Sequence, residues 1–295
     1  LGVTMMGNIS VSKLISLWFR KYTGRALGIA SVGVSFAGFV FPNLTSFLLG
    51  DLGLTWREAY LLFGTLIILI NVPVVYLFVV NKPSDINQIP DGEEVTDNSE
   101  DTSGIDWTIP DLLKDRNFWI LSLVFAIQFC SMMGILSHLT FFSEGAGWSP
   151  SWGAFIFSMY AWPAMFSKVF FGWLVENKID ARLAVSIAVL IQAIATLLII
   201  FVESPEQMVV LVMIFGFGGG SALPLSNILF NQAYTNKSFG KARGAAQPFI
   251  SIFQISGTLV AARMFDVFGN YELAFLTLGF ILIVPLIAIW FLKKA

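Results

Sequence analysis

Residues 183–202 read LAVSIAVLIQAIATLLIIFV, a run of 20 residues without Asp, Glu, Lys or Arg. A helix that spans a bilayer needs about 20 mostly apolar residues, and a run this long without period-2 alternation excludes a barrel strand. Seven further runs share this character, so the sequence predicts eight membrane-spanning helices. The runs cover residues 26–49, 59–80, 117–143, 145–167, 183–202, 207–236, 244–262 and 273–292.

The composition of the whole chain agrees with this prediction. Of its 295 residues, 56% are hydrophobic and 12% are charged, whereas soluble domains are about 45–50% apolar and about 25% charged. The net charge of −2 leaves no basic surface for nucleic acid. Cys130 is the single cysteine, so an intrachain disulfide and a cysteine-based metal site are excluded.

The basic residues indicate the orientation in the membrane. They lie in every second gap between the runs, from Arg20, Lys21 and Arg25 before the first complete run to Lys293 and Lys294 after the last. Cytoplasmic loops carry the excess of Lys and Arg. The pattern therefore predicts a multi-pass protein of the plasma membrane with a cytoplasmic C-terminus.

The gap at residues 82–115 differs from the others because it holds ten acidic residues together with Pro, Ser, Asn and Gly. It is predicted to be a solvated cytoplasmic linker, a tether without chemistry, although residues 107–113 are also compatible with a short amphipathic piece. The linker separates residues 1–81, the remainder of an N-terminal bundle, from residues 116–295, a C-terminal bundle of six helices.

A weak internal repeat supports this division. Arg25 and Arg243 both open an apolar run after a basic gap, and they lie 218 residues apart. Parallel repeats of helix blocks are common in transporters. Six spans in each half imply a parent with 12 spans, of which this chain begins inside the fourth.

Several short motifs resemble one known family in their order and spacing. It is the major facilitator superfamily, and within it the branch of monocarboxylate porters and oxalate:formate antiporters. The motifs are W-F-R-K at 18–21, R-A-L-G at 25–28, N-F-W at 117–119, K-x-x-x-G-W-L at 168–174 and F-D-x-x-G-N-Y at 265–271.

The resemblance implies an all-α major facilitator fold that comprises the end of span 4 and spans 5–12. It also implies alternating access, a small organic anion such as a monocarboxylate as substrate, no cofactor, and a monomer in the lipid bilayer. Protons and a counter-anion both stay open as the coupled species. Another cargo, such as a sugar or a drug, and a non-transporting sensor are the alternatives. The chain lacks H-E-x-x-H and in-span aspartate pairs, so an intramembrane enzyme is not expected.

Lys168 is the sharpest candidate for a binding residue. It follows 23 uncharged residues, and ionisable side chains within a span usually face a cavity. The resemblance implies that it binds a substrate carboxylate; snorkelling to the interface is the alternative. The residues predicted to share its helix face, with room for a ligand beside the ammonium, are Phe157, Ala161, Ala164 and Gly172. At Ala164 the branch's proton-coupled porters often carry Asp, so no proton-coupling carboxylate is expected here.

The remaining candidates form two groups. Expected to line the substrate site are Ala164, Tyr160, His138, Gln128, Asn227, Asn231 and Gln254, and His138 equally fits a neutral imidazole that is hydrogen-bonded between helices. Expected to act in gating or structure are Arg20, Gly24, Arg25, Gly172, Glu176, Arg243, Arg263 and Asp266, with Glu176 holding an inward gate and Arg263 paired with Asp266. The glycine-rich run at 215–221 fits a hinge or close helix packing equally well.

Overall fold

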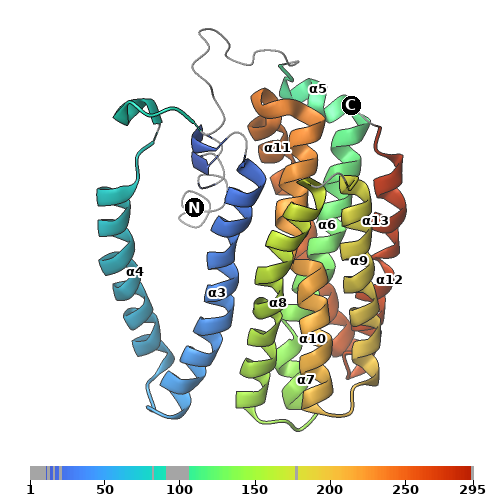
Figure 1. Ribbon diagram of the computed structural model, residues 1–295. Helices are drawn as coiled ribbons and strands as arrows, with labels where there is room; N and C mark the ends of the chain where they lie inside the picture. The colour runs from blue at the N-terminus through green and yellow to red at the C-terminus, as the bar shows by residue number, and fades with distance from the viewer. Residues whose placement is uncertain are drawn as a thin grey trace.

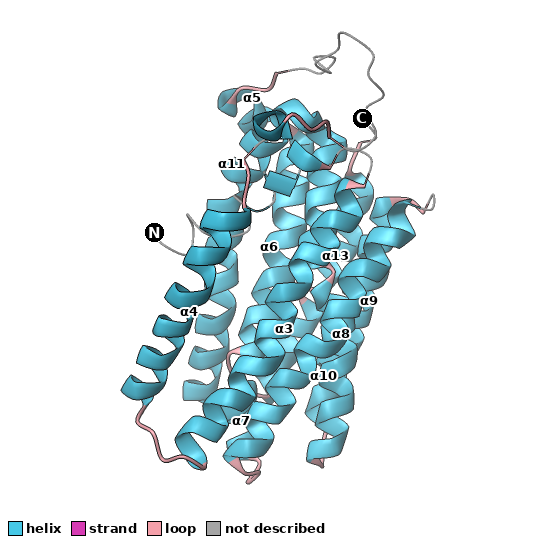
Figure 2. Cartoon of the chain, turned by 60° about the vertical axis from the view of Figure 1, so that its left-hand side comes forward, coloured by secondary structure: helices cyan, strands magenta, loops and turns pink. Residues whose placement is uncertain are grey.

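The computed structural model describes residues 11, 14, 15, 17–19, 22–81, 83–90, 106–176 and 179–293, with the backbone alone at 23, 24, 27 and 235–237. The described residues are helical apart from short turns and loops, without a β-strand, and the long helices run side by side (Figures 1 and 2). The α-helices are α3 (Thr23–Gly50), α4 (Trp56–Phe78), α5 (Ile109–Lys114), α6 (Arg116–Leu136), α7 (Leu139–Gly145), α8 (Pro150–Glu176), α9 (Ala181–Leu198), α10 (Pro205–Gly220), α11 (Ala222–Phe268), α12 (Glu272–Phe280) and α13 (Ile283–Ala288), and the 3-10 turns are η1 (Pro83–Ile86), η2 (Ile199–Phe201) and η3 (Ile289–Phe291).

Eight helical segments of the described residues are long and apolar enough to cross a membrane, and they match the eight predicted runs one to one. Local capping fixes where two of them, α4 and α10, start. Thr55 accepts a hydrogen bond from the backbone N–H of Glu58 at the start of α4, and Ser204 does the same for α10, which begins with Pro205. Such caps satisfy amide groups that the first helical turn leaves open.

Helix α11 contains a reversal of the chain. Its residues are helical from Ala222 to Phe268, but they belong to two candidate spans that are separated between Tyr234 and Ser238. A straight helix would place Asn227 and Arg243 about 24 Å apart. The guanidinium of Arg243 nevertheless donates to the side-chain oxygen of Asn227 at 3.3 Å, so the chain folds back between them.

The helices from α6 onward form one bundle, with α3 against its α8 side and α4 farther out (Figure 1). We call the end of the molecule near α5 the linker end and the opposite end, near α7, the far end. Helix α3 runs from the linker end to the far end, whereas α8 runs in the opposite direction (Figure 1). The two helices are therefore antiparallel neighbours.

Glycines bring the helices of the bundle into backbone contact. A Cβ atom at Gly216 would lie 2.3 Å from the carbonyl oxygen of Tyr160, and one at Gly220 would lie 2.5 Å from the Cα of Ala164. Both glycines lie on α10 and both contacts are with α8. The run at 215–221 thus serves close helix packing, which is the second of its two predicted roles.

The last part of the linker is anchored on the bundle. The carboxylate of Asp106 pairs with Lys241 at 2.6 Å, and the backbone N–H of Trp107 donates to the hydroxyl of Ser238 at 2.9 Å. Leu112 of α5 is fully buried. Residues 106–115 therefore fit the alternative prediction of a short structured piece, which an apolar side chain and polar contacts fix against the turn of α11. That the linker carries no chemistry stays a prediction.

Candidate functional site

Lys168 bonds across the interface between α8 and α3. Its ammonium Nζ donates to the backbone carbonyl of Ser31 and to the hydroxyl of Ser35, both at 2.8 Å. The residue is 6% exposed. The ammonium therefore points to α3 and not toward an interface with water, which argues against snorkelling.

Small residues let α3 and α8 approach closely along this contact, which we call the seam: Gly28, Ser31, Ser35 and Gly38 of α3 against Ala161 and Lys168 of α8. A Cβ atom at Gly28 would lie 3.7 Å from the carbonyl oxygen of Lys168, and one at Gly38 would lie 3.4 Å from the Cβ of Ala161. The seam is therefore packed from Gly28 to Gly38.

An ion pair lies at the linker end of the seam. The guanidinium Nε of Arg25 is 2.7 Å from a carboxylate oxygen of Glu176, and their side chains are 52% and 29% exposed. The guanidinium also lies over the ring of Tyr22, 5.4 Å from its centroid. Arg25 lies in the first turn of α3 and Glu176 is the last residue of α8, so the pair joins the two helices at the linker end.

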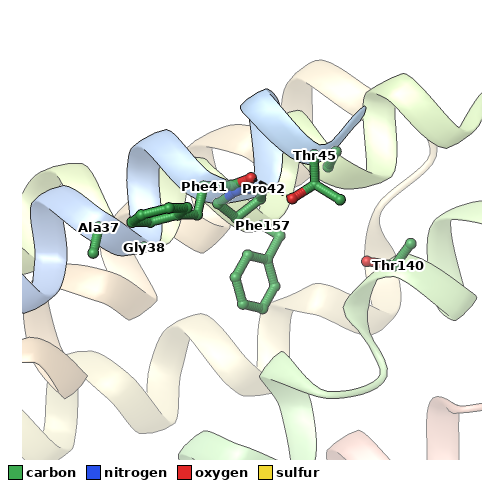
Figure 3. Close-up of a pocket in the computed structure, with 8 residues that line it drawn as sticks. Ala37, Gly38, Phe41, Pro42, Thr45, Thr140 and Phe157 are labelled. Carbon is green, nitrogen blue, oxygen red and sulfur yellow. Dashed lines mark hydrogen bonds between the residues drawn. The ribbon is translucent and has the colours of Figure 1, made fainter. Parts of the chain in front are cut away.

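Toward the far end the seam opens into a pocket with a volume of about 460 Å³. Figure 3 shows Phe41, Pro42 and Thr45 of α3, with Phe157 of α8 beside them. The full lining comprises Ala37, Gly38, Phe41, Pro42, Thr45, Thr140, Ala154 and Phe157. The pocket is mainly apolar, and Gly38 belongs both to its lining and to the end of the seam.

The space beside Lys168 differs from the prediction. Ala164 packs against Gly220 of α10, and Ala161 packs against Gly38 of α3. These small residues leave room for neighbouring helices and not for a ligand. Ala164 is thus a packing residue in this conformation, and the pocket lies farther toward the far end.

Two other predicted ligand residues lie inside the C-terminal bundle. The hydroxyl of Tyr160 donates to the sulfur of Met132 at 3.0 Å. The side-chain amide of Gln128 donates to that of Gln192 at 3.3 Å. Both contacts join helices of the same bundle, and neither residue lines the pocket.

His138 holds three helical segments together at the far end. Its Nε2 lies 3.1 Å from the carbonyl oxygen of Thr258, and its Nδ1 lies 3.2 Å from the hydroxyl of Tyr271. A carbonyl only accepts, so Nε2 donates to Thr258, and in the neutral imidazole Nδ1 then accepts from the hydroxyl of Tyr271. Burial, and then the charge of Asp266, raise the pKa of the Tyr271 hydroxyl, which keeps it a donor. The structure agrees with the hydrogen-bonded alternative for His138.

Arg243 is buried on α11 and is held by amide oxygens. It donates to Asn227 at 3.3 Å and to Gln247 at 2.8 Å, and it is 8% exposed. Its counterpart in the sequence repeat, Arg25, is exposed and paired with a carboxylate. The partly buried Gln254 follows Gln247 on the same helix face, two turns on. Asn227 thus partners Arg243 in this conformation.

The other predicted residues are placed as follows. Asn231 is partly buried on α11, and Gly172 is buried on α8 about one turn from Lys168. Arg263 and Asp266 are both exposed, and in the described part of the chain they are not within ion-pair distance of each other. The predicted ion pair is therefore not formed in this structure, although the two residues lie one turn apart on α11. Arg20 lies outside the described residues, and only the backbone of Gly24 is described.

Ser31 and Ser35 were not among the predicted site residues. Their signal is nevertheless present in the sequence, because Gly28, Ser31, Ser35 and Gly38 recur every three or four residues and so share one helix face. Such a stripe predicts close packing. It does not say which helix packs there or that a lysine from it reaches the two serines.

The fold and the seam define a multi-pass helical membrane protein in which an antiparallel helix pair encloses a buried ammonium group. Residues 1–196 and 150–295 both match the Major Facilitator Superfamily. The chain belongs to this family, whose members are membrane transporters and not enzymes.

Individual transporters are similar to this chain over most of its length. The chain is 25% identical over 272 residues to monocarboxylate transporter 13 of Bos taurus, which covers 90% of this chain and 59% of the relative. It is 22% identical over 264 residues to an MFS-type transporter of Gibberella moniliformis, covering 87% and 58%. The chain thus spans somewhat more than half the length of these relatives.

Solved structures agree on the fold. The crystal structure of the E. coli fucose:proton symporter FucP is similar with a TM-score of 0.68 at 15% identity, over 97% of this chain and 73% of that chain. A second structure of FucP, in the outward conformation, gives a TM-score of 0.63 over 97% and 72%. At this identity the likeness concerns the fold alone.

Proposed function

We propose that this chain is part of a secondary active transporter that carries a small organic anion, foremost a monocarboxylate, by alternating access. Residues 1–81 and 116–295 would belong to its two moving halves. The membrane would be the plasma membrane, with the linker and the C-terminus on the cytoplasmic side.

The observation that carries the proposal is the buried ammonium of Lys168. It lies between α8 and α3, and its hydrogen-bond partners among the described residues are neutral oxygens. A cation without a carboxylate partner is costly within a membrane span, and such residues usually mark a substrate path. The name of the mammalian relative, a monocarboxylate transporter, supports the same substrate class.

The seam supports a role in gating. It is packed and ion-paired at the linker end and opens into a pocket toward the far end. With the linker end on the cytoplasmic side, this arrangement corresponds to a state that is closed inside and open outside. Substrate would then enter the pocket from outside and leave after the seam opens at Arg25 and Glu176.

Flux through the complete transporter tests the proposal. Reconstituted in proteoliposomes, it is expected to take up labelled pyruvate saturably, with competition by lactate but not by fucose. Uptake that follows an imposed pH gradient would identify proton coupling, whereas uptake that requires trapped lactate would identify exchange. Pyruvate binding without flux would favour a sensor, and uptake of fucose in place of pyruvate would overturn the anion assignment.

The ion pair at the linker end gives a separate prediction. Glu176→Lys places two cations together and is expected to favour opening at this end by about 1 kcal/mol, roughly a fivefold shift in population, because exposed pairs contribute little. Spin labels at Ile29 of α3 and Leu183 of α9 would report longer distances.

The matched control is the double exchange Arg25→Glu with Glu176→Arg, which restores the attraction and should restore the wild-type distances. Unchanged distances in Glu176→Lys would show that the pair does not act as a gate.

A further inference from the structure

We propose that Ser35 is a positioning residue that holds Lys168 in the seam until a substrate carboxylate takes over the ammonium, and that this exchange releases α3 from α8. The inference rests on the proposed function, because it requires that the transported anion meets Lys168. It adds the step by which binding of the anion is converted into movement of the helices.

The ammonium is held by partners that a carboxylate can replace. Lys168 has three N–H donors, and two of them bond to the carbonyl of Ser31 and the hydroxyl of Ser35. Both acceptors are neutral, and in the described part of the chain no carboxylate forms an ion pair with Lys168. A charge-assisted bond to a carboxylate is shorter and stronger than a bond to a neutral oxygen. An anion that arrives therefore competes favourably for this ammonium.

The pocket brings an anion within reach of the ammonium. Ser35 lies three residues before Gly38, which lines the pocket, and three residues of α-helix rise by about 4.5 Å. The oxygen that holds Lys168 is thus about one helical turn from the pocket. The lysine stem has four flexible carbons and carries its charge on a compact head. A small shift of the side chain brings it to a carboxylate at this end of the pocket.

Loss of the hydrogen bonds from Lys168 to α3 weakens the contact between α3 and α8. The other described contacts between α3 and α8 include van der Waals contacts at Gly28 and Gly38, the rings of Phe39 and Trp162, and the exposed ion pair of Arg25 with Glu176. Exposed ion pairs are weak in water. A ligand shifts a conformational equilibrium by its difference in affinity for the two states. A carboxylate that competes with Ser35 binds better once α3 has moved away, so it favours the open seam.

A purely structural Ser35 leads to a different expectation. If the hydroxyl only fills space or helps to orient Lys168 for the ligand, its removal leaves pyruvate affinity unchanged or lowers it. If it competes with the ligand, its removal raises the affinity. The sign of the change therefore separates the two roles.

The experiment uses the complete transporter in lipid nanodiscs, free of other reactive cysteines, with spin labels at Leu52 and Glu144. Both positions are exposed: Leu52 follows α3 and Glu144 belongs to α7, and these are the segments of Thr45 and Thr140, which line the pocket. Titration with pyruvate gives the population with a closed far end and an apparent Kd. The variants are Ser35→Ala, Ser35→Thr, which keeps the hydroxyl, and Ser46→Ala, a matched change three turns farther along α3 and outside the seam.

In the wild type we expect pyruvate to raise the population in which the far end is closed. Ser35→Ala should raise that population without pyruvate and lower the apparent Kd by about three- to tenfold, the range that the loss of one competing hydrogen bond allows. Ser35→Thr and Ser46→Ala should follow the wild type. A Kd for Ser35→Ala that is unchanged or higher, or a ligand-free population equal to that of the wild type, overturns the hand-over.

Lys168→Gln separates this inference from the proposed function. If Lys168→Gln no longer responds to pyruvate while Ser35→Ala behaves as the wild type, the anion site stands and only the hand-over is wrong. If Lys168→Gln responds as the wild type, or the wild type does not respond to pyruvate at all, the proposed anion site itself is wrong. The ligand-free comparison of Ser35→Ala with the wild type still decides whether the serine holds the seam.

Discussion

Lys168→Ala is expected to abolish pyruvate uptake, by a factor of at least about 30, while the protein still inserts and folds. Removal of one partner of a buried charge-assisted pair costs about 2–5 kcal/mol, which corresponds to this factor or more. Insertion should not suffer, because a lysine within a span is itself unfavourable by about 2.5–3.5 kcal/mol. Initial uptake rates, normalised to the amount of monodisperse protein in the membrane, measure the effect.

Lys241→Ala is the matched control for this prediction. It is the same change at an exposed lysine whose partner is Asp106 of the linker, and it should leave uptake near the wild-type level. Lys168→Arg keeps the charge and should retain part of the activity. Near-normal uptake by Lys168→Ala would remove the central support for an organic anion as substrate.

The spans were predictable because backbone polar groups in a bilayer must be hydrogen-bonded within the protein, which leaves helices and closed barrels as the spanning structures. The uncharged run at 145–167 shows the limit of charge counting, because it stops before Lys168 although the helix was expected to include Lys168 and Gly172, and α8 continues to Glu176. Helices end where capping or turn residues stop them, and a single lysine does neither. The break between α6 and α7, next to His138, lies inside an uncharged run and left no signal in the charge pattern.

The site was less predictable than the spans. Helix periodicity predicts which residues share a helix face, but it does not predict which helix packs against that face. The small residues around Lys168 were predicted to share its helix face, yet Ala164 meets a glycine of α10 whereas Ala161 meets a glycine of α3. Small residues leave space for a ligand or for a helix, and only the tertiary arrangement decides between them. For Ser31 and Ser35, too, the sequence indicates the shared helix face but not the neighbouring helix.

The sequence repeat likewise does not predict which residues contact each other. Arg25 and Arg243 occupy corresponding positions in the sequence, and both were expected to act in gating. In the structure one is exposed and paired with Glu176, and the other is buried and held by amide groups. A repeat predicts where a residue lies along its helix, whereas its electrostatic partner depends on the helix that packs beside it.

Gly257→Ala is expected to lower the free energy of unfolding by about 3 kcal/mol, a typical cost of overpacking a tight core. Gly257 lies where α11 crosses α6, and a Cβ atom there would lie 2.0 Å from the carbonyl oxygen of Cys130. The obstacle is backbone, so no side-chain rotation relieves it. The thermal unfolding midpoint in detergent, followed by size-exclusion chromatography, measures the loss.

Gly240→Ala is the matched change on the same helix, at a position where an added Cβ meets nothing within 4 Å. There the helix preference of alanine over glycine, about 1 kcal/mol, should stabilise the protein or leave it unchanged. The same preference acts at Gly257 and has to be overcome by the clash, so opposite signs at the two sites isolate the close approach of α6 and α11. If Gly257→Ala unfolds at the wild-type temperature, the two helices do not touch through this glycine, and the packing that fixes the C-terminal bundle behind the seam has a different basis.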